Sequence, residues 1–139
     1  VAANPGQPPR PLRKVASGGE LSRISLAIEV ATQGQDAVPC MIFDEVDAGI
    51  GGAVAAAVGA KLRQLGASKQ VLCVTHQPQV AAAGHTQYRV SKAAQAGITQ
   101  SAVMALNDDG RIEEIARMLG GADVSDEARA AARRLLQQG

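Results

Sequence analysis

Aromatic side chains are nearly absent from this 139-residue chain, which has one Phe, one Tyr and no Trp. A stacking platform that binds single-stranded nucleic acid needs several aromatic rings, so that kind of module is excluded. An excess of one charge is absent too, because fourteen basic residues against thirteen acidic ones leave a net charge of +1. A surface that neutralises many phosphates is therefore not expected.

Long hydrophobic runs are also missing. No apolar run reaches the roughly 18 residues that cross a bilayer, and the first residues lack the charged and apolar regions of a secretory signal. We therefore expect a cytoplasmic protein with no membrane partner. Cysteine is scarce: Cys40 and Cys73 each lie inside a short apolar run, where a reduced thiol acts as a small core residue. Cys73 and His76 alone are too few ligands to predict a zinc site.

The large hydrophobic residues are few. Leu, Ile, Val and Phe supply only 31 of the 139 residues, so we expect folding of the chain alone to be marginal.

Residues 1–16 predict the end of a strand followed by a proline-rich loop, because residues 4–13 contain four prolines. Position 1 is Val rather than Met, which favours a piece of a longer protein.

Residues 17–86 predict a helix followed by a strand–helix–strand unit. Ser17 is the expected N-cap of the first helix, whose apolar residues recur at helical spacing on one face: Leu21, Ile24, Ile28 and Ala31. The apolar runs 40–43 and 71–74 are typical of strands buried on both faces. A helix over 54–65, ending near Gly66, connects them, so the two strands are predicted to pair in parallel.

Residues 87–139 predict a β-hairpin and two helices, after a short helical stretch at 79–83. The strands span 87–92 and 98–106 and are joined by a turn through Gly97. Asn107 or Asp108 caps the first of the two helices, which ends at residues 120–121. Ser125 begins the last helix.

The segment Ser17, Gly18, Gly19 and Glu20 is the first candidate site. Two glycines let the backbone approach a ligand closely, and the amides and dipole of a helix start favour an anion, so a phosphate would fit. The alternative is a plain serine cap followed by a flexible turn.

Polar side chains that follow two neighbouring strands form the second candidate site. Asp44 and Glu45 follow the first strand, and His76 follows the second. Parallel strands bring their carboxyl ends to one edge, so these groups could face one phosphate, with Asp44 holding Mg²⁺ and Glu45 orienting or deprotonating a water. The alternatives are a pair of solvated acids and a histidine that caps its own strand.

These motifs, in this order, resemble those of ABC-type ATPase heads. Residues 17–20 resemble the signature motif, 41–45 the Walker B strand, 47–52 the D-loop, and His76 the switch histidine. The longer runs 14–23, 43–51 and 74–81 are more specific and resemble the SMC-like ATPases of bacterial DNA double-strand break repair. The resemblance implies an α/β fold class: the carboxyl-terminal part of a P-loop NTPase head, with parallel strands, flanking helices, a β-hairpin and C-terminal helices.

The resemblance also implies the site roles. In that family two heads, here two copies of one protein, close around two ATP molecules. Four residues would then bind the ATP of the partner head in trans: Ser17, Gly18, Gly19 and Glu20. Asp44 would hold Mg²⁺ through water, Glu45 would act as the catalytic base, and His76 would contact the γ-phosphate. The D-loop would be carried by Asp47, Gly49 and Gly51.

The sequence departs from the family pattern in two places. No G-x-x-x-x-G-K-[ST] motif occurs in the 139 residues, so this chain by itself is not expected to hydrolyse ATP. An amino-terminal half of the head carrying that Walker A loop would be needed, and DNA would be contacted by the full-length, nucleoid-associated protein. SMC-type D-loops usually end in an aspartate, whereas Gly51 stands here.

Two alternatives to this interpretation stay open. The chain could come from another SMC-type head or from an ABC transporter subunit. It could instead be a non-catalytic module that binds a partner or DNA through a basic loop containing Arg10, Arg13 and Lys14, although such a loop is more often simply solvated.

Overall fold

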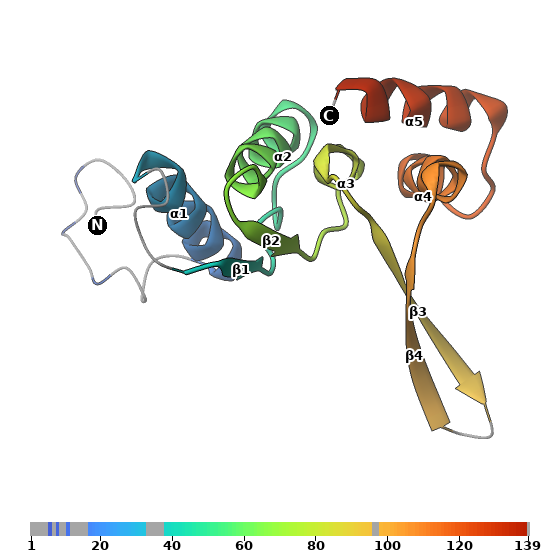
Figure 1. The fold of residues 1–139 in the computed structure, drawn as a ribbon, viewed down its shortest axis with the longest axis horizontal. Helices are drawn as coiled ribbons and strands as arrows, with labels where there is room; N and C mark the ends of the chain where they lie inside the picture. Colours follow the sequence, from blue (N-terminus) through green and yellow to red (C-terminus); the bar gives the residue numbers. More distant parts are fainter. Residues whose placement is uncertain are drawn as a thin grey trace.

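The computed structural model describes residues 6, 8, 11, 17–32, 38–95 and 98–138. The order of elements is α1 (Gly18–Ala31), β1 (Cys40–Phe43), α2 (Gly52–Gly66), β2 (Gln70–Cys73), α3 (Pro78–Ala83), β3 (Tyr88–Gln95), β4 (Ile98–Ala105), α4 (Asp108–Gly120) and α5 (Asp126–Gln138). Figure 1 shows a mixed α/β arrangement with a small parallel sheet, β1–β2, and a small antiparallel one, β3–β4. Within the described ranges, no helix is long and apolar enough to cross a membrane.

The predicted strand–helix–strand unit is confirmed. β1 and β2 pair in parallel, in a register that runs from Cys40 opposite Gln70 to Phe43 opposite Cys73. β2 begins and ends one residue before the predicted run 71–74, but the Val74 amide still donates to the Phe43 carbonyl at 3.0 Å. The carboxyl ends of the two strands therefore lie at the same edge, as expected for a parallel pair.

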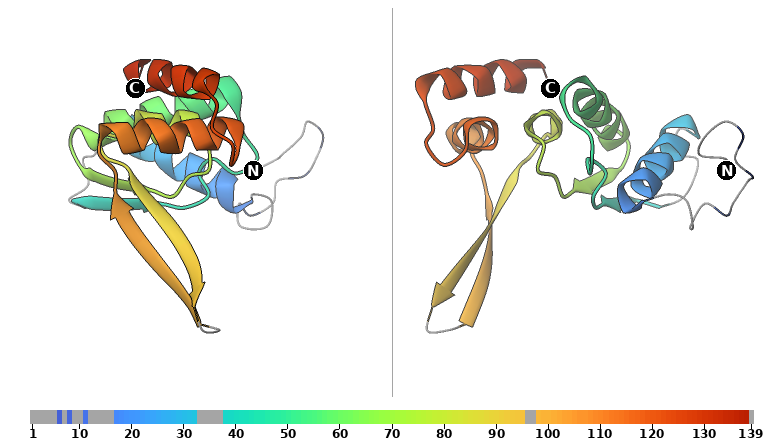
Figure 2. Two further views of the ribbon diagram at one scale, coloured as in Figure 1. Left: turned by 90° about the vertical axis from the view of Figure 1, so that its right-hand side faces the viewer. Right: turned by 180° about the vertical axis from the view of Figure 1, so that it is seen from behind.

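The prediction that these strands are buried on both faces is wrong for the described residues. Phe43 points into a core formed with α1 and α2, which lie on one side of the sheet (Figures 1 and 2). Three side chains on the other side are exposed, with Ile42 at 73%, Leu72 at 44% and Val74 at 64%. Alternate residues of a strand point to opposite faces, and only one face has a covering layer of helices here.

The apolar face of the first helix that the spacing identifies is not its buried face. Leu21, Ile24 and Ile28 are exposed, whereas Leu26 is buried against the core. The helix is apolar on more than one side, and contacts to the next loop fix its rotation. Ser22 Oγ donates to the Asp44 carbonyl at 2.8 Å, and an adjacent arginine donates to two further carbonyls of that loop.

The second half of the chain forms the predicted hairpin and helices. β3 and β4 project from the body as a two-stranded ribbon (Figure 1), and β3 extends past its predicted end at 92. The predicted turn residue Gly97 lies outside the described residues. Asn107 is the N-cap of α4, because its Oδ1 accepts from the Gly110 amide at 2.9 Å. α3, α4 and α5 share a second, alanine-rich core: Ala81, Ala82, Ile115, Ala116 and Ala132.

α2 and α3 approach each other closely at Gly59. A Cβ at that position would lie 3.0 Å from both the Ala83 Cβ and the Gln79 carbonyl oxygen, which is tighter than ordinary van der Waals contact. A side chain at this position would force one of the two helices to shift by a few tenths of an ångström, so glycine suits this close approach. The contact fixes α3 beside α2 and so positions the loop that joins β2 to α3.

Candidate functional site

The segment of residues 17–20 forms a capped helix start, which confirms the predicted N-cap. Ser17 Oγ accepts from the Glu20 amide at 3.3 Å, and the Glu20 carboxylate accepts from the Ser17 amide at 2.7 Å. These two hydrogen bonds form a capping box. The hydrogen bond from the Ser17 backbone, followed by the one from its side chain, lowers the pKa of Glu20. The Glu20 carboxylate is thus bonded to the Ser17 amide as part of the cap, and Ser17 and Gly18 are exposed.

The start of α1 lies directly against the loop that follows β1. A Cβ on Gly18 would meet Glu45 Oε2 at 2.7 Å, and a Cβ on Gly19 would meet the Glu45 carbonyl oxygen at 2.7 Å and the Ala48 Cβ at 2.9 Å. At Gly19 the two backbones can approach this closely only because that residue has no side chain. The structure therefore brings the signature-like segment and the end of the Walker B-like strand together within one chain.

Asp44 and Glu45 are both exposed at the carboxyl edge of the sheet. Glu45 has a φ of +56°, a left-handed backbone conformation that is uncommon for a residue other than glycine. Such conformations concentrate at functional sites. Among the described residues, no hydrogen bond or ion pair joins Glu45 to His76.

The fit of Asp44 to a magnesium ion depends on how many protein ligands the ion needs. No group of three or more His, Cys, Asp or Glu side chains within the described ranges could hold a metal. Mg²⁺ in phosphate-binding sites keeps several waters and uses one or two carboxylates together with the phosphates. The exposed Asp44 carboxylate fits that arrangement, although it could not hold an ion alone.

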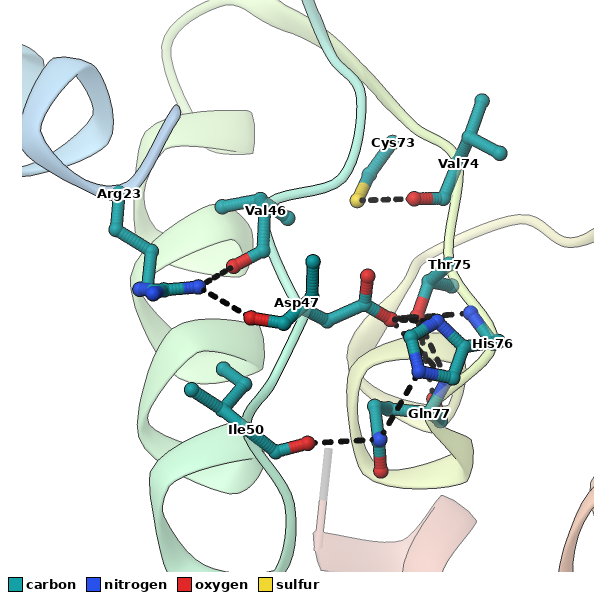
Figure 3. Close-up of polar contacts among 10 residues, drawn as sticks. Arg23, Val46, Asp47, Ile50, Cys73, Val74, Thr75, His76 and Gln77 are labelled. Atoms are coloured by element: carbon teal, nitrogen blue, oxygen red, sulfur yellow. Dashed lines mark hydrogen bonds and ion pairs between the residues drawn. The ribbon is translucent and has the colours of Figure 1, made fainter. Parts of the chain in front are cut away.

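Asp47 is the most enclosed polar residue of this region, with 1% of its surface exposed. As Figure 3 shows, its Oδ2 accepts from the Thr75 hydroxyl, from the His76 amide at 3.0 Å and from the Gln77 amide at 3.2 Å. The same oxygen lies 3.4 Å from Nδ1 of the His76 ring. The carboxylate therefore joins the loop after β1 to the loop after β2.

The charge state of Asp47 follows from these contacts. Burial on its own raises the pKa of the carboxyl, but the hydrogen bonds from Thr75, His76 and Gln77, together with the His76 ring, outweigh it and lower the pKa overall. Asp47 is thus an ionised group held in place by amide and hydroxyl donors. The sequence predicted Asp47 only as a member of the D-loop, and this anchoring role was missed.

Gln77 is a second residue that the sequence analysis missed. Its side-chain Nε2 donates to the Ile50 carbonyl at 2.8 Å and lies 3.3 Å from Nε2 of His76. The only signal in the sequence was that a run of hydrogen-bonding residues, Thr75, His76 and Gln77, follows an apolar strand.

The rest of the D-loop-like segment is a tight turn that leads into α2. Gly49 has a φ of +72°, which favours glycine, while Gly51 has an extended backbone and is the N-cap of α2 without a side-chain hydrogen bond. Cys73 lies beside this region, and burial raises the pKa of its thiol to about 12. The basic loop with Arg10, Arg13 and Lys14 lies outside the described residues.

The fold is similar to that of an SMC-type ATPase. A solved structure described as "Structural biochemistry of ATP-driven dimerization and DNA stimulated activation of SMC ATPases" matches with a TM-score of 0.56 over 82% of this chain and 68% of that chain, at 22% sequence identity. No family model matches the chain.

In sequence, the chain is homologous over almost its whole length to a segment of the DNA repair protein RecN. It is 69% identical to RecN of Xylella fastidiosa (strain Temecula1) over 138 residues, and 54% identical to RecN of Vibrio cholerae over 136. RecN of Bacillus subtilis is 43% identical over 138 residues. The chain spans about a quarter of the length of these curated relatives, at 25%, 24% and 24%.

Proposed function

We propose that this chain is the carboxyl-terminal part of an SMC-like ATPase head that acts in DNA double-strand break repair and recombination. One observation carries the proposal: three motifs, distant along the chain, meet at one edge of the parallel sheet. Asp44 and Glu45 follow β1, His76 follows β2, and the start of α1 lies against the first of these loops. Ligands of open α/β sheets bind at this edge, and the homology to RecN supports the same assignment.

In this proposal the residues divide the work of ATP hydrolysis. Asp44 would hold Mg²⁺ through water, and the ion would supply charge neutralisation at the phosphates. Glu45 would orient and deprotonate the attacking water, and His76 would contact the γ-phosphate. The signature-like residues would act in trans, on ATP bound to a second copy of the head: Ser17, Gly18, Gly19 and Glu20.

The proposed trans role requires the Glu45 side chain to move. Its carboxylate lies against Gly18, where a phosphate from the partner head would approach the positive end of α1. Two anions would repel each other there. Closure of the head dimer would therefore require Glu45 to turn away from α1 and toward its own nucleotide.

The proposed head needs a Walker A loop, which this chain does not contain. An amino-terminal part of the head would supply it and would cover the bare apolar side of the sheet, formed by Ile42, Leu72 and Val74. Residues 17–86 would then be the motif-bearing unit of this head, and residues 87–139 its hairpin and two helices. The strand end and loop predicted for residues 1–16 lie almost entirely outside the described residues. DNA would be bound by the full-length protein.

The experiment replaces Glu45 by Gln in the full-length protein that contains this chain. Gln keeps the size of the side chain but cannot take a proton from water, so ATP binding should persist while hydrolysis falls by about 10²-fold or more. Nucleotide binding and phosphate release would be measured in parallel. Glu113→Gln, which changes a carboxylate on α4, is the matched control and should hydrolyse normally. Normal turnover of Glu45→Gln would remove Glu45 from the mechanism.

A further inference from the structure

The His76 ring lies between two polar side chains, one at each nitrogen (Figure 3). On one side, Asp47 Oδ2 lies 3.4 Å from Nδ1. On the other side, the Gln77 side-chain nitrogen lies 3.3 Å from Nε2. The ring itself is mostly exposed, so these contacts, rather than close packing, fix its orientation.

The Gln77 amide can be oriented in only one way. Its nitrogen lies 2.8 Å from the Ile50 carbonyl oxygen, and a carbonyl can only accept a hydrogen bond, so the atom at that position must be the NH₂ group. One of the two hydrogens goes to Ile50. The second is available for His76 Nε2, which can accept it only when Nε2 carries no proton.

The contact on the other side leads to the same conclusion. The Asp47 carboxylate is ionised and can only accept, so it favours a proton on the ring nitrogen that faces it, Nδ1. Both neighbours therefore select the same neutral form of the ring, with the proton on Nδ1 and a lone pair on Nε2. Neutral imidazole exposed to solvent has no such constraint.

We propose that Asp47 and Gln77 are positioning residues that hold His76 in the Nδ1-protonated tautomer and connect its ring to the 47–50 segment. The functional consequence rests on the function proposed above. A lone pair on Nε2 repels a phosphate oxygen, so Gln77 keeps the ring in place until a phosphate competes for Nε2. Nε2 can donate to a phosphate oxygen only when it carries a proton, so the γ-phosphate contact proposed above requires Gln77 to release Nε2 and that nitrogen to be protonated, while the Asp47 carboxylate still faces Nδ1.

The tautomer can be measured without nucleotide by ¹⁵N NMR of the histidine-labelled chain. The chain has two histidines, and His85→Gln assigns the signals by elimination. At a pH where the ring is neutral, we expect Nδ1 of His76 to be protonated and Nε2 not. Gln77→Leu should shift the ratio toward the Nε2-protonated form, and Gln64→Leu, on the exposed side of α2, should leave it unchanged. A dominant Nε2-protonated form in the parent chain, or an unchanged ratio in Gln77→Leu, would overturn the proposal.

The full-length protein supplies the second measurement. Asp47→Asn should lower kcat for ATP hydrolysis by about tenfold to a hundredfold while KM changes less than about twofold, because the ring is misplaced but the nucleotide still binds. An unchanged kcat would overturn the positioning role of Asp47. If the parent protein has no ATPase activity, the proposed function is wrong. The NMR measurement still tests the tautomer of His76 independently of that outcome. If Asp47→Asn fails to fold, Gln77→Leu keeps the tautomer proposal testable.

Discussion

Gly18 and Gly19 are neighbours in sequence but face different atoms of the loop after β1. A side chain on Gly18 would meet the carboxylate end of the flexible Glu45 side chain, which can move away at low cost. A side chain on Gly19 would meet the backbone carbonyl of Glu45 and the Ala48 Cβ, neither of which can move alone. The same residue type in the same motif therefore has two different physical functions.

At the residue scale we predict different changes in stability for two alanine substitutions. Gly19→Ala should destabilise the chain by about 1–3 kcal/mol, because overpacking forces the loop away from α1. Gly18→Ala should be nearly neutral, because the higher helix propensity of alanine, worth about 1 kcal/mol, offsets a small displacement of Glu45. Urea unfolding of both variants measures the difference. Equal destabilisation would contradict the close packing of Gly19.

At the scale of elements, the hairpin and α4 are joined through Glu114. Its carboxylate accepts two hydrogen bonds from Arg117, at 2.9 and 2.6 Å, and lies 3.6 Å from Arg89 of β3. The hydrogen bonds from Arg117 are the largest influence and, together with the charges of both arginines, they lower the pKa of Glu114 against the opposing effect of burial. This group of charges fixes the base of the projecting ribbon.

The lowered pKa of Glu114 gives a pH dependence with a definite sign. The ionised form is favoured by folding, so its contribution to stability is present above the ordinary glutamate pKa, about 4.3, and is lost as the pH falls through the lower folded value. Glu114→Gln should reduce the free energy of unfolding at pH 7 by about 1–2 kcal/mol and flatten the fall below about pH 4. Urea unfolding across this range measures both effects. Glu113 is more exposed, so Glu113→Gln should reduce the free energy of unfolding by less. An equal reduction in the two variants would contradict the role of Glu114.

At the scale of the whole molecule, the part of the chain that the structure describes has two cores and one bare sheet face. The first core lies between the parallel sheet, α1 and α2, and the second lies among α3, α4 and α5. Ile42, Leu72 and Val74 form an apolar surface on the opposite side of the sheet. Burial of such a surface is favourable, at about 25 cal/mol per Å². It is the surface on which we propose that the amino-terminal part of the head packs.

This proposal predicts that Ile42→Asn affects assembly rather than folding. In the 139-residue chain the change in unfolding free energy should be small, within about 0.5 kcal/mol, because Ile42 is 73% exposed. Binding of the chain to a separately produced amino-terminal part should weaken by about tenfold or more, as calorimetric titration would show. Val103→Asn, at a similarly exposed strand position on the hairpin, is the control. Equal weakening by both would contradict the proposed face.

Local patterns predicted the elements well, because they depend on residues only a few positions apart. Ser17 is the cap that the sequence predicts, and of the two candidates Asn107 and Asp108 the structure selects Asn107; each cap accepts a hydrogen bond from the amide three residues later. The order of strands and helices followed from apolar runs and their spacing. The buried side of α1 could not be predicted, because Leu26 and Ile28 are equally apolar and contacts 22 to 25 residues away, through Ser22 and Arg23, select between them.

The sequence by itself determined which residues could do chemistry. Residue type and the ends of apolar runs identify the glycine-rich helix start, the two acids after β1 and the histidine after β2. Only the tertiary structure decided that Asp47 anchors the His76 loop, that Gln77 joins the ring to Ile50, and that Gly19 is a packing residue. The reason is physical. These contacts span 25 or more positions along the chain, and their hydrogen bonds form only after the strands pair and fix the distance between the two loops.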